Sequence, residues 1–335
     1  MYYCGIDIAK YKHEATVIDE AGTALLDSIS FTNSTEGCEK LLALFDRLSI
    51  PKENLLIGME ATGHYWPSVY GYLLEHGFEI KVINPIQSEA FRKMYIRQTK
   101  NDRKDSFIIA QIMRFGQFSV TNLSEETIVA LRQLSCYRLA LVDACGDCKR
   151  RVIALLDQVF PEYDALFSDT FGVASKEVLS QHPTPEDLLS VPTRKRSHLL
   201  EKASHGRLGK EKAEQLKAAA ANSFGVSFAK DAFAFQIRQL IEQLEFLEGQ
   251  IAELEGQISS LLKQTGSYIT TIPGIWDTLG AIILSEIGDI HRFDAPNKLV
   301  AFAGLDVRVT QSGEFTGTRQ KISKRGSPYL RRAIW

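Results

Sequence analysis

The run Tyr2-Tyr3-Cys4-Gly5-Ile6-Asp7-Ile8-Ala9 decides the fold, because it is an apolar strand that carries one carboxylate. Apolar residues flank Asp7 on both sides, and a carboxylate in such a setting is costly to desolvate unless another group neutralises it. Short apolar or alternating runs recur along the next 80 residues and predict further strands. These runs are residues 13–19, 27–32, 55–60 and 79–84.

Helical patterns lie between and after these runs. They cover about residues 36–47, 66–77, 86–95 and 103–117. Three strands in succession, followed by strands that alternate with helices, predict an α/β domain with a mixed sheet covered by helices. We place this first domain at residues 1–120.

The middle of the chain, residues 121–265, has a helical pattern. Residues 124–160 read as one long helix, and prolines and glycines divide 169–225 into short helices. From Phe233 to Leu261, apolar residues alternate spacings of four and three, which is the a/d seam of a coiled coil. This helix could pack on the 124–160 helix of its own chain. It could also pair with a second copy, and we expect it to assemble a homodimer or homotetramer.

Residues 266–335 form a third, mostly helical unit. A helix over 277–287, a turn at Gly288-Asp289 and a helix near 295–302 resemble a helix-hairpin-helix, whose backbone N–H groups can take a phosphate. An ordinary helical hairpin that binds no phosphate would show the same sequence pattern.

Composition narrows the class of protein. With 335 residues, 44% hydrophobic and 24% charged, the chain is long enough for about two domains and is globular rather than disordered. It has no apolar run long enough for a membrane span and no signal-peptide pattern. Five scattered cysteines suit a reducing compartment, so we expect a cytoplasmic protein.

The formal net charge of -2 argues against a nucleic-acid partner only on average, because the charges are segregated. Residues 231–262 carry a net charge of -5, whereas 192–217 and 306–332 each carry +5. A local basic block can create a polyanion site whatever the total charge.

Four acids form the candidate metal site. Asp7 and Glu60 belong to apolar strands, while Asp102 and Asp105 lie three residues apart at a predicted helix start, on one helical face. If they meet at the carboxyl edge of the sheet, their oxygens suit Mg²⁺ or Mn²⁺, two ions or fewer. Asp102 and Asp105 could instead be acids of the first helical turn that only stabilise the helix through its dipole.

Basic residues with interleaved aromatics surround these acids and favour a phosphate backbone as partner. They are Arg92, Lys93, Arg97, Lys100, Arg103 and Lys104. A solvated helix face is the alternative.

At this point the motifs resemble a known family, the IS110 family of insertion-sequence transposases. The resemblance covers about residues 3–112 and 270–333. It rests on Gly5-Ile6-Asp7, Met59-Glu60-Ala61-Thr62-Gly63, Val82-Ile83-Asn84-Pro85, Lys100-Asn101-Asp102-Arg103-Lys104-Asp105, Ile272-Pro273-Gly274-Ile275, Phe302-Ala303-Gly304-Leu305, Gln311-Ser312-Gly313 and Ile322-Ser323-Lys324-Arg325-Gly326.

The resemblance implies a RuvC-like, RNase H-type first domain in which Asp7, Glu60, Asp102 and Asp105 are a DEDD metal-binding tetrad. It also implies that Ser312 is a nucleophile that forms a covalent phosphoserine link to cleaved DNA. Such enzymes are recombinases guided by a non-coding bridge RNA that pairs with target and donor DNA. They act as dimers of dimers, in which one subunit's RuvC-like domain meets another's serine domain. The resemblance thus implies a bacterial protein that acts at the nucleoid.

The chemistry agrees with that implication. A serine hydroxyl needs a base or a metal to become a good nucleophile, and no Gly-x-Ser-x-Gly elbow surrounds Ser312. Sequence alone does not select Ser312 over Ser323 or Ser327. Nearby basic side chains would hold nucleic-acid phosphates, namely Arg308, Arg319, Lys321, Lys324 and Arg325.

The sequence departs from the family pattern in two places. Ser106 stands where the family usually has Ala, which keeps a small residue. The sequence ends at Trp335 soon after Leu330-Arg331-Arg332-Ala333, where family members usually continue, so we expect a short or truncated variant.

Two other functions remain open at this point. The same domain could be a hydrolytic nuclease of the junction-resolvase type with water as nucleophile, or a non-catalytic nucleic-acid scaffold. The pair Cys145 and Cys148 lacks the second ligand pair that a zinc site needs, and the chain has no P-loop.

Overall fold

The computed structural model describes residues 1–61, 63–83, 85–93, 102–116, 126–307, 311–312, 315–316 and 321–335. The chain forms two compact units, Met1–Leu123 and Ser124–Trp335.

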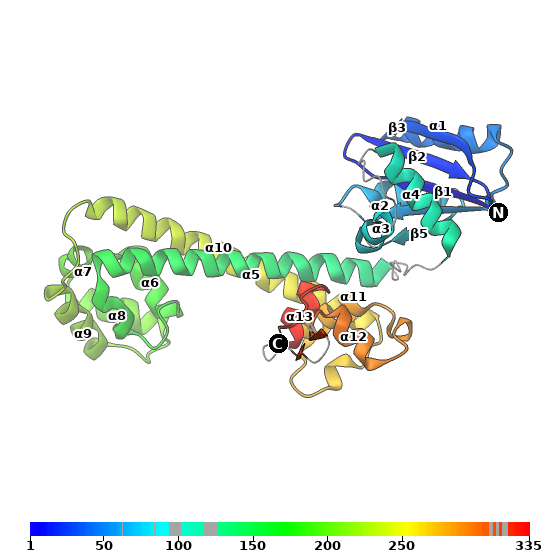
Figure 1. The fold of residues 1–335 in the computed structure, drawn as a ribbon. Helices are drawn as coiled ribbons and strands as arrows, with labels where there is room; N and C mark the ends of the chain where they lie inside the picture. The colour runs from blue at the N-terminus through cyan, green and yellow to red at the C-terminus, as the bar shows by residue number, and fades with distance from the viewer. Residues whose placement is uncertain are drawn as a thin grey trace. The chain divides into compact units, whose positions relative to one another are not determined.

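The first unit is built on a five-stranded mixed sheet (Figure 1). Its strands are β1 (Tyr2–Asp7), β2 (Lys12–Ile18), β3 (Ala24–Thr32), β4 (Leu55–Glu60) and β5 (Glu79–Ile83), in the order β3-β2-β1-β4-β5. The pairs β1–β2 and β2–β3 are antiparallel, whereas β1–β4 and β4–β5 are parallel. The predicted mixed sheet is therefore confirmed.

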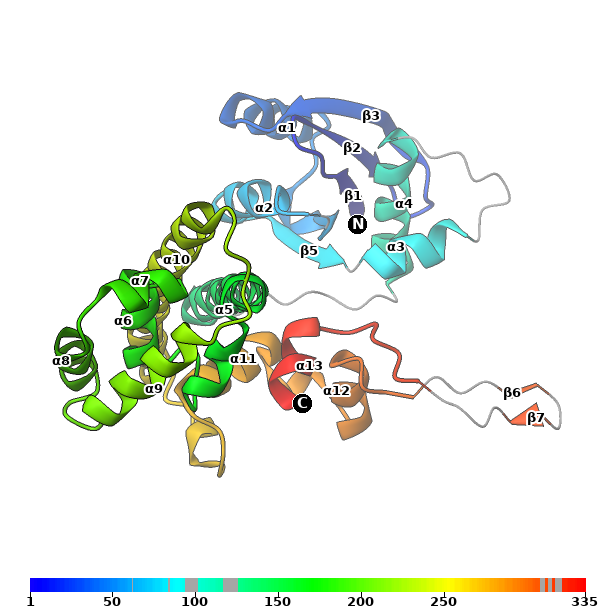
Figure 2. The same ribbon diagram turned by 90° about the vertical axis from the view of Figure 1, so that its left-hand side faces the viewer.

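Helices cover both faces of this sheet, as Figure 2 shows. On one face lie α1 (Thr35–Arg47) and α2 (Trp66–Glu75), and on the other lie α3 (Pro85–Arg92) and α4 (Asp102–Phe115); a 3₁₀ turn, Lys52–Asn54, precedes β4. The domain has three layers, with helices on each side of the sheet, because successive side chains of β1 point to opposite faces. Cys4 and Ile6 belong to the core with α1 and α2, whereas Tyr3 packs with the apolar residues of α4.

The second unit is organised around two long helices, α5 (Glu126–Val159) and α10 (Lys230–Gln264). Leu131 packs with Ile258, and Val152 packs with Ile237, so the two helices run antiparallel. The apolar seam of α10 thus packs on α5 of the same chain, which is the intrachain alternative. Assembly of two chains through this helix stays a prediction.

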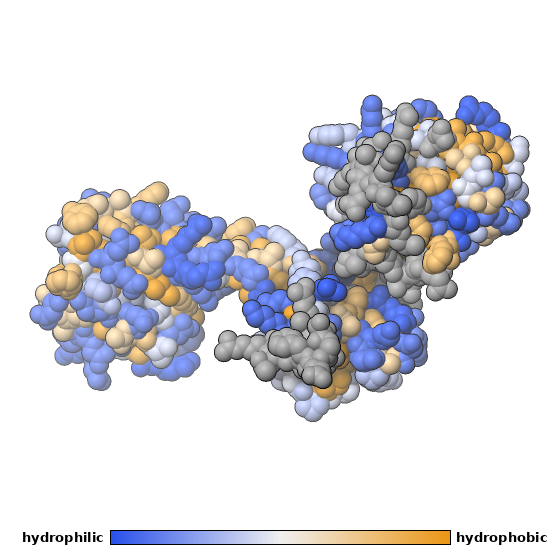
Figure 3. Space-filling view, viewed as in Figure 1, coloured by the Kyte–Doolittle hydropathy of each residue, from blue (hydrophilic) through white to orange (hydrophobic). Residues whose placement is uncertain are grey.

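Short helices fill the loop between α5 and α10 and form a lobe with its own core around the buried Tyr163. They are a 3₁₀ turn at Pro161–Leu166, α6 (Val173–Gln181), α7 (Pro185–Ser190), α8 (Thr193–Ala203) and α9 (Lys210–Ala221). Figure 3 shows hydrophilic residues along the lower edge of this lobe, where α8 and α9 lie in Figure 1.

The C-terminal part of the second unit packs on α5 and α10 through α11 (Asp277–Ile287). The remaining elements are 3₁₀ turns at Ile269–Thr271 and Ile290–Arg292, α12 (Pro296–Phe302), the two-residue strands β6 (Gln311–Ser312) and β7 (Phe315–Thr316), and α13 (Pro328–Ile334). The predicted helices over 277–287 and near 295–302 are confirmed. A role for this hairpin in phosphate binding stays a prediction.

The described residues contain no disulfide and no helix that could span a membrane. Their five cysteines are all free, and Cys145 and Cys148 are buried between α5 and α10. Across the same parts of the chain, each helix is too short or too polar to cross a membrane.

Candidate active site

Two carboxylates end neighbouring parallel strands. Asp7 is the last residue of β1 and Glu60 is the last residue of β4. The preceding residues, Ile6 and Met59, are register partners, so Asp7 and Glu60 stand in the same row of the sheet. Because residues two apart in a strand share a face, Asp7 points to the side of Gly5 and Glu60 to the side of Gly58.

Helix α4 covers that face. A Cβ at Gly5 would lie 2.1 Å from the carbonyl oxygen of Ser106 and 2.3 Å from the nitrogen of Ala110, so the helix backbone rests directly on β1. A Cβ at Gly58 would lie 2.5 Å from the side chain of Met113. The two glycines therefore allow α4 to approach the strands that carry Asp7 and Glu60.

Contacts along α4 show in which direction the helix runs across the sheet. Ser106 lies over Gly5, and the Oγ atoms of Thr16 and Ser106 are 2.7 Å apart. Further along α4, the side-chain nitrogen of Gln111 donates to the carbonyl oxygen of Gly22, beyond the end of β2 that pairs with the start of β1. The helix thus runs antiparallel to β1, and its beginning, with Asp102 and Asp105, lies toward the carboxyl end of that strand.

Asp105 is a buried acid near the start of α4. It is 7% exposed, and Nη2 of Arg92 lies 3.0 Å from its Oδ1. That oxygen accepts no hydrogen bond from the residues that the structure describes. A buried carboxylate needs a counter-charge, and here Arg92 supplies it.

Glu60 is also held by helix α3. The hydroxyl of Ser88 donates to Oε2 of Glu60 over 2.7 Å, and Ser88 is buried. No sequence signal pointed to Ser88, because its role depends on how α3 packs against the sheet.

The tetrad as a metal site stays a prediction. Within the described ranges, no group of three or more His, Cys, Asp or Glu side chains is arranged to hold a metal ion. Asp102 begins α4, but its side chain lies outside the described residues. The donor set is chemically suitable, since it offers only carboxylate oxygens, which Mg²⁺ and Mn²⁺ prefer, and one buried Asp105 oxygen accepts no hydrogen bond.

The predicted phosphate-binding residues near these acids differ in their surroundings. Arg92 pairs with Asp105, and Lys93, directly after α3, pairs with Glu89 of that helix at 3.0 Å. Lys104 is exposed on the first turn of α4. Arg97, Lys100 and the side chain of Arg103 lie outside the described residues.

Ser312 lies in β6 and is the register partner of Phe315 in β7. Its side chain is outside the described part, as are Arg308 and Arg319, while Lys321, Lys324 and Arg325 are exposed.

Two other serines near the C-terminus, Ser323 and Ser327, have structural partners. Ser323 Oγ donates to Oδ1 of Asp306, and Ser327 Oγ accepts from the backbone nitrogen of Leu330 and so caps α13. These bonds give Ser323 and Ser327 a structural role.

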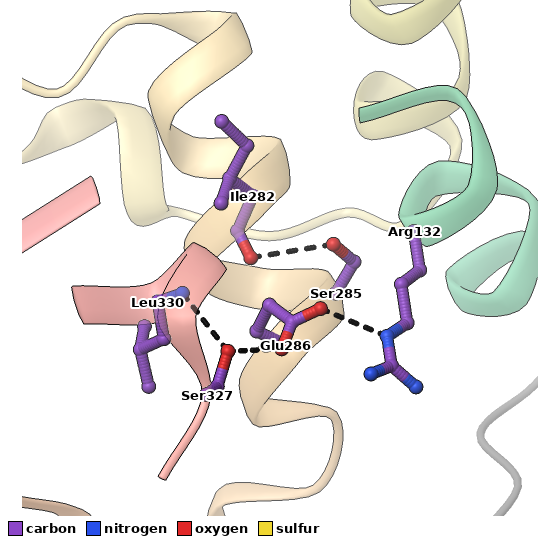
Figure 4. Close-up of polar contacts among 6 residues, drawn as sticks. All are labelled: Arg132, Ile282, Ser285, Glu286, Ser327 and Leu330. Carbon is purple, nitrogen blue, oxygen red and sulfur yellow. Dashed lines mark hydrogen bonds and ion pairs between the residues drawn. The ribbon is translucent and has the colours of Figure 1, made fainter. Parts of the chain in front are cut away.

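A buried glutamate, Glu286, joins three segments of the second unit (Figure 4). Its Oε1 accepts from Nε of Arg132 over 2.8 Å, and its Oε2 accepts from the hydroxyl of Ser327. One carboxylate therefore joins α5, α11 and the start of α13. The sequence signal for this role is an acid inside the apolar run Ala281–Ile287.

A second feature lies between α8 and α9. A hollow of about 1010 Å³ is lined by the basic side chains of Arg194, Lys195 and Lys210 together with Glu201 and Glu214. The two acids offset most of the positive charge there.

Comparison with known proteins agrees with these observations. The IS110 DEDD transposase family matches residues 4–161, and the "Transposase IS116/IS110/IS902 family" matches residues 266–335. The mini-circle protein for IS117 of Streptomyces coelicolor is 23% identical over 332 residues, covering 95% of this chain and 79% of that protein. The pilin gene-inverting protein of Moraxella bovis is also 23% identical, over 99% of this chain and 80% of its own.

Among solved structures, RuvC of Thermus thermophilus is similar over 36% of this chain and 99% of its own, with 14% identity and a TM-score of 0.27. The two family matches together cover more than half of the sequence. The chain belongs to the IS110 family of insertion-sequence transposases, which are DNA transposases and recombinases.

Proposed function

We propose that this transposase is an RNA-guided recombinase that cleaves and rejoins DNA through a covalent link to Ser312. The observation that supports its metal-dependent half is the seating of α4 on Gly5, which brings the helix acids toward Asp7 and Glu60. Asp7, Glu60, Asp102 and Asp105 would hold one or two divalent cations, Mg²⁺ or Mn²⁺.

The reaction balances without another reactant. Ser312 Oγ attacks a DNA phosphorus and loses its proton, the Oγ–P bond forms, and the P–O bond to the neighbouring sugar breaks, so the departing sugar oxygen takes up a proton. A divalent cation, when bound, supplies positive charge that lowers the pKa of a hydroxyl and neutralises phosphate. The reverse attack by a sugar hydroxyl rejoins DNA and frees the serine.

The assignment of Ser312 is supported by its neighbours. Ser323 and Ser327 already have structural hydrogen bonds, and Gly326 between them is in close backbone contact. A Cβ at Gly326 would lie 1.8 Å from the carbonyl oxygen of Phe302, so this residue must be glycine for the chain to fold back. Ser312, in the β6–β7 hairpin, would then be the reactive hydroxyl.

Bridge RNA, target and donor DNA, and a second copy of the chain are the partners that we propose. The exposed side chains of Lys321, Lys324 and Arg325 are suited to phosphate contacts. The site would form between subunits, with the acids of one chain and the serine of another.

The test is covalent trapping on cleaved DNA. The wild-type protein should give a protein–DNA adduct with Mg²⁺, and Ser312→Ala should give neither adduct nor cleavage. Ser323→Ala is the matched control and should retain the adduct. Normal cleavage by Ser312→Ala without any adduct would instead indicate a hydrolytic nuclease that uses water. Sequencing of RNA that co-purifies with the protein tests the guide, and absence of a discrete RNA would contradict RNA guidance.

A further inference from the structure

Helix α3 presents two polar side chains, one turn apart, to two of the four candidate ligands. Ser88 donates to Oε2 of Glu60 over 2.7 Å, and Nη2 of Arg92 lies 3.0 Å from Oδ1 of Asp105. Spacing of i, i+4 places Ser88 and Arg92 on the same side of α3. One short helix therefore contacts an acid from the sheet and an acid from α4.

Packing and backbone contacts fix α3 in this position. Ser88 is 1% exposed, and its hydroxyl also lies within hydrogen-bond distance, 2.9 Å, of the carbonyl oxygen of Pro85. The ring of Phe91 packs against the apolar residues of α4, with its centroid 6.1 Å from that of Phe115. The two polar contacts are thus made by a helix that is itself seated on α4.

Arg92 supplies the positive charge that a metal ion would otherwise supply to Asp105. The Asp105 side chain is 9% exposed and that of Arg92 is 25% exposed, so water screens the pair only weakly. Yet Oδ1 of Asp105 accepts no hydrogen bond from the described residues, so the guanidinium neutralises the carboxylate without a directed bond. A cation that ligates this oxygen must displace or repel the guanidinium.

We propose that Ser88 and Arg92 are positioning residues of the metal site. Ser88 orients Glu60 as a ligand, and Arg92 is an exchangeable counter-ion that holds Asp105 until a divalent cation replaces it. This inference rests on the proposed metal site.

The test measures Mn²⁺ binding to the full chain without nucleic acid. The electron paramagnetic resonance signal of free Mn²⁺ reports how much of the ion is unbound. Ser88→Ala should weaken binding about tenfold, a typical effect of losing a bond that orients a ligand. Arg92→Gln should change affinity in the opposite direction, with Mn²⁺ bound about tenfold more tightly, because the competing charge is gone. Arg92→Lys keeps the charge and should return the affinity close to wild type.

Thermal unfolding gives a second readout. Without metal, Arg92→Gln should unfold at a lower temperature than wild type, because Asp105 is left buried without its partner. Added Mn²⁺ should raise the unfolding temperature of this variant more than that of wild type. A residue that merely supports the fold would lose stability without gaining affinity.

Lys93→Gln is the matched control, since it removes the same charge from the residue directly after α3, at an exposed pair with Glu89, and its Mn²⁺ affinity should not change. Unchanged or weaker Mn²⁺ binding by Arg92→Gln, or unchanged binding by Ser88→Ala, overturns the inference. Asp7→Asn distinguishes failure of the proposed metal site from failure of the proposed roles of Ser88 and Arg92. If it loses Mn²⁺ while the α3 variants behave like wild type, only the inference fails; if wild type binds no Mn²⁺, or Asp7→Asn binds it equally well, the metal site and the inference both fail.

Discussion

The Cα of Gly5 lies so close to Ser106 that a Cβ at Gly5 would be 2.1 Å from the Ser106 carbonyl oxygen. This contact joins the strand of Asp7 to the helix of Asp105. Because the obstructing atoms are backbone, they cannot turn aside as a flexible side chain would.

Gly5→Ala should therefore displace α4. We expect a loss of about 1–3 kcal/mol or more in the free energy of unfolding, as for other overpacked sites, together with loss of cleavage. Urea denaturation and a DNA-cleavage assay measure the two effects. Gly71→Ala on α2 is the control, since no atom lies within 4 Å of its added Cβ, and it should be neutral or stabilising by about 0.5–1 kcal/mol. Wild-type stability in Gly5→Ala would mean that α4 does not rest on this strand.

Asp7→Asn should reduce cleavage roughly a hundredfold or more, as losing a charge-stabilising group does elsewhere. Nucleic-acid binding should stay nearly intact, because the substitution removes ligand charge and no phosphate contact. Cleavage rates and filter-binding affinities measured on the same preparations check both parts. Asp46→Asn, at an exposed position of α1 on the opposite face of the sheet, should leave both unchanged. An equal loss of binding in Asp7→Asn would show that Asp7 is structural.

Glu286→Gln should destabilise the second unit by about 1–3 kcal/mol, because Arg132 loses its charged partner and the bond to Ser327 weakens. The transition of this unit in urea is the measurement. Glu253→Gln, at an exposed position of α10, should change stability by less than about 0.5 kcal/mol. Equal stability of the two variants would contradict the role of Glu286 in joining α5, α11 and α13.

His13 should make the first unit sensitive to mild acid. Burial lowers the pKa of this imidazole, whose Nδ1 accepts from the backbone nitrogen of Ala9. Because the unfolded chain then binds a proton more readily than the folded chain, stability is retained above about pH 6.5 and falls as the pH drops below it. The slope should not exceed about 1.4 kcal/mol per pH unit.

Urea unfolding between pH 7.5 and 5.5 measures this dependence. His13→Gln should flatten it, whereas His198→Gln, which is exposed on α8, should not. A wild-type stability that does not fall between these pH values would refute the prediction.

Periodicity was sufficient to predict most elements of the fold. The strands of the sheet and the long helices α5 and α10 follow the predicted ranges, because each has a strong apolar pattern along its length. The predicted start of β3 is wrong, as the strand begins at Ala24 and not at residue 27. Its pairing with β2 is irregular near Val17, which interrupts the alternating pattern there. The hairpin of β6 and β7 has strands of two residues, too short for any period.

The contacts at the candidate site depend on tertiary packing and could not be predicted from local pattern. Arg92 was predicted to contact phosphate, and the structure pairs it with Asp105 because α3 and α4 share a face of the sheet. Likewise, the seam of α10 has the pattern of a coiled coil, and such a pattern specifies a partner helix without specifying which chain supplies it.

The most direct test is an anomalous diffraction map of crystals grown with Mn²⁺. We predict a manganese peak with oxygens of Asp7, Glu60 and the two α4 acids at about 2.0–2.3 Å, close to the distances of hard divalent ions. A map with no peak among these carboxylates, or with the α4 acids directed away from Asp7 and Glu60, would contradict the proposed chemistry.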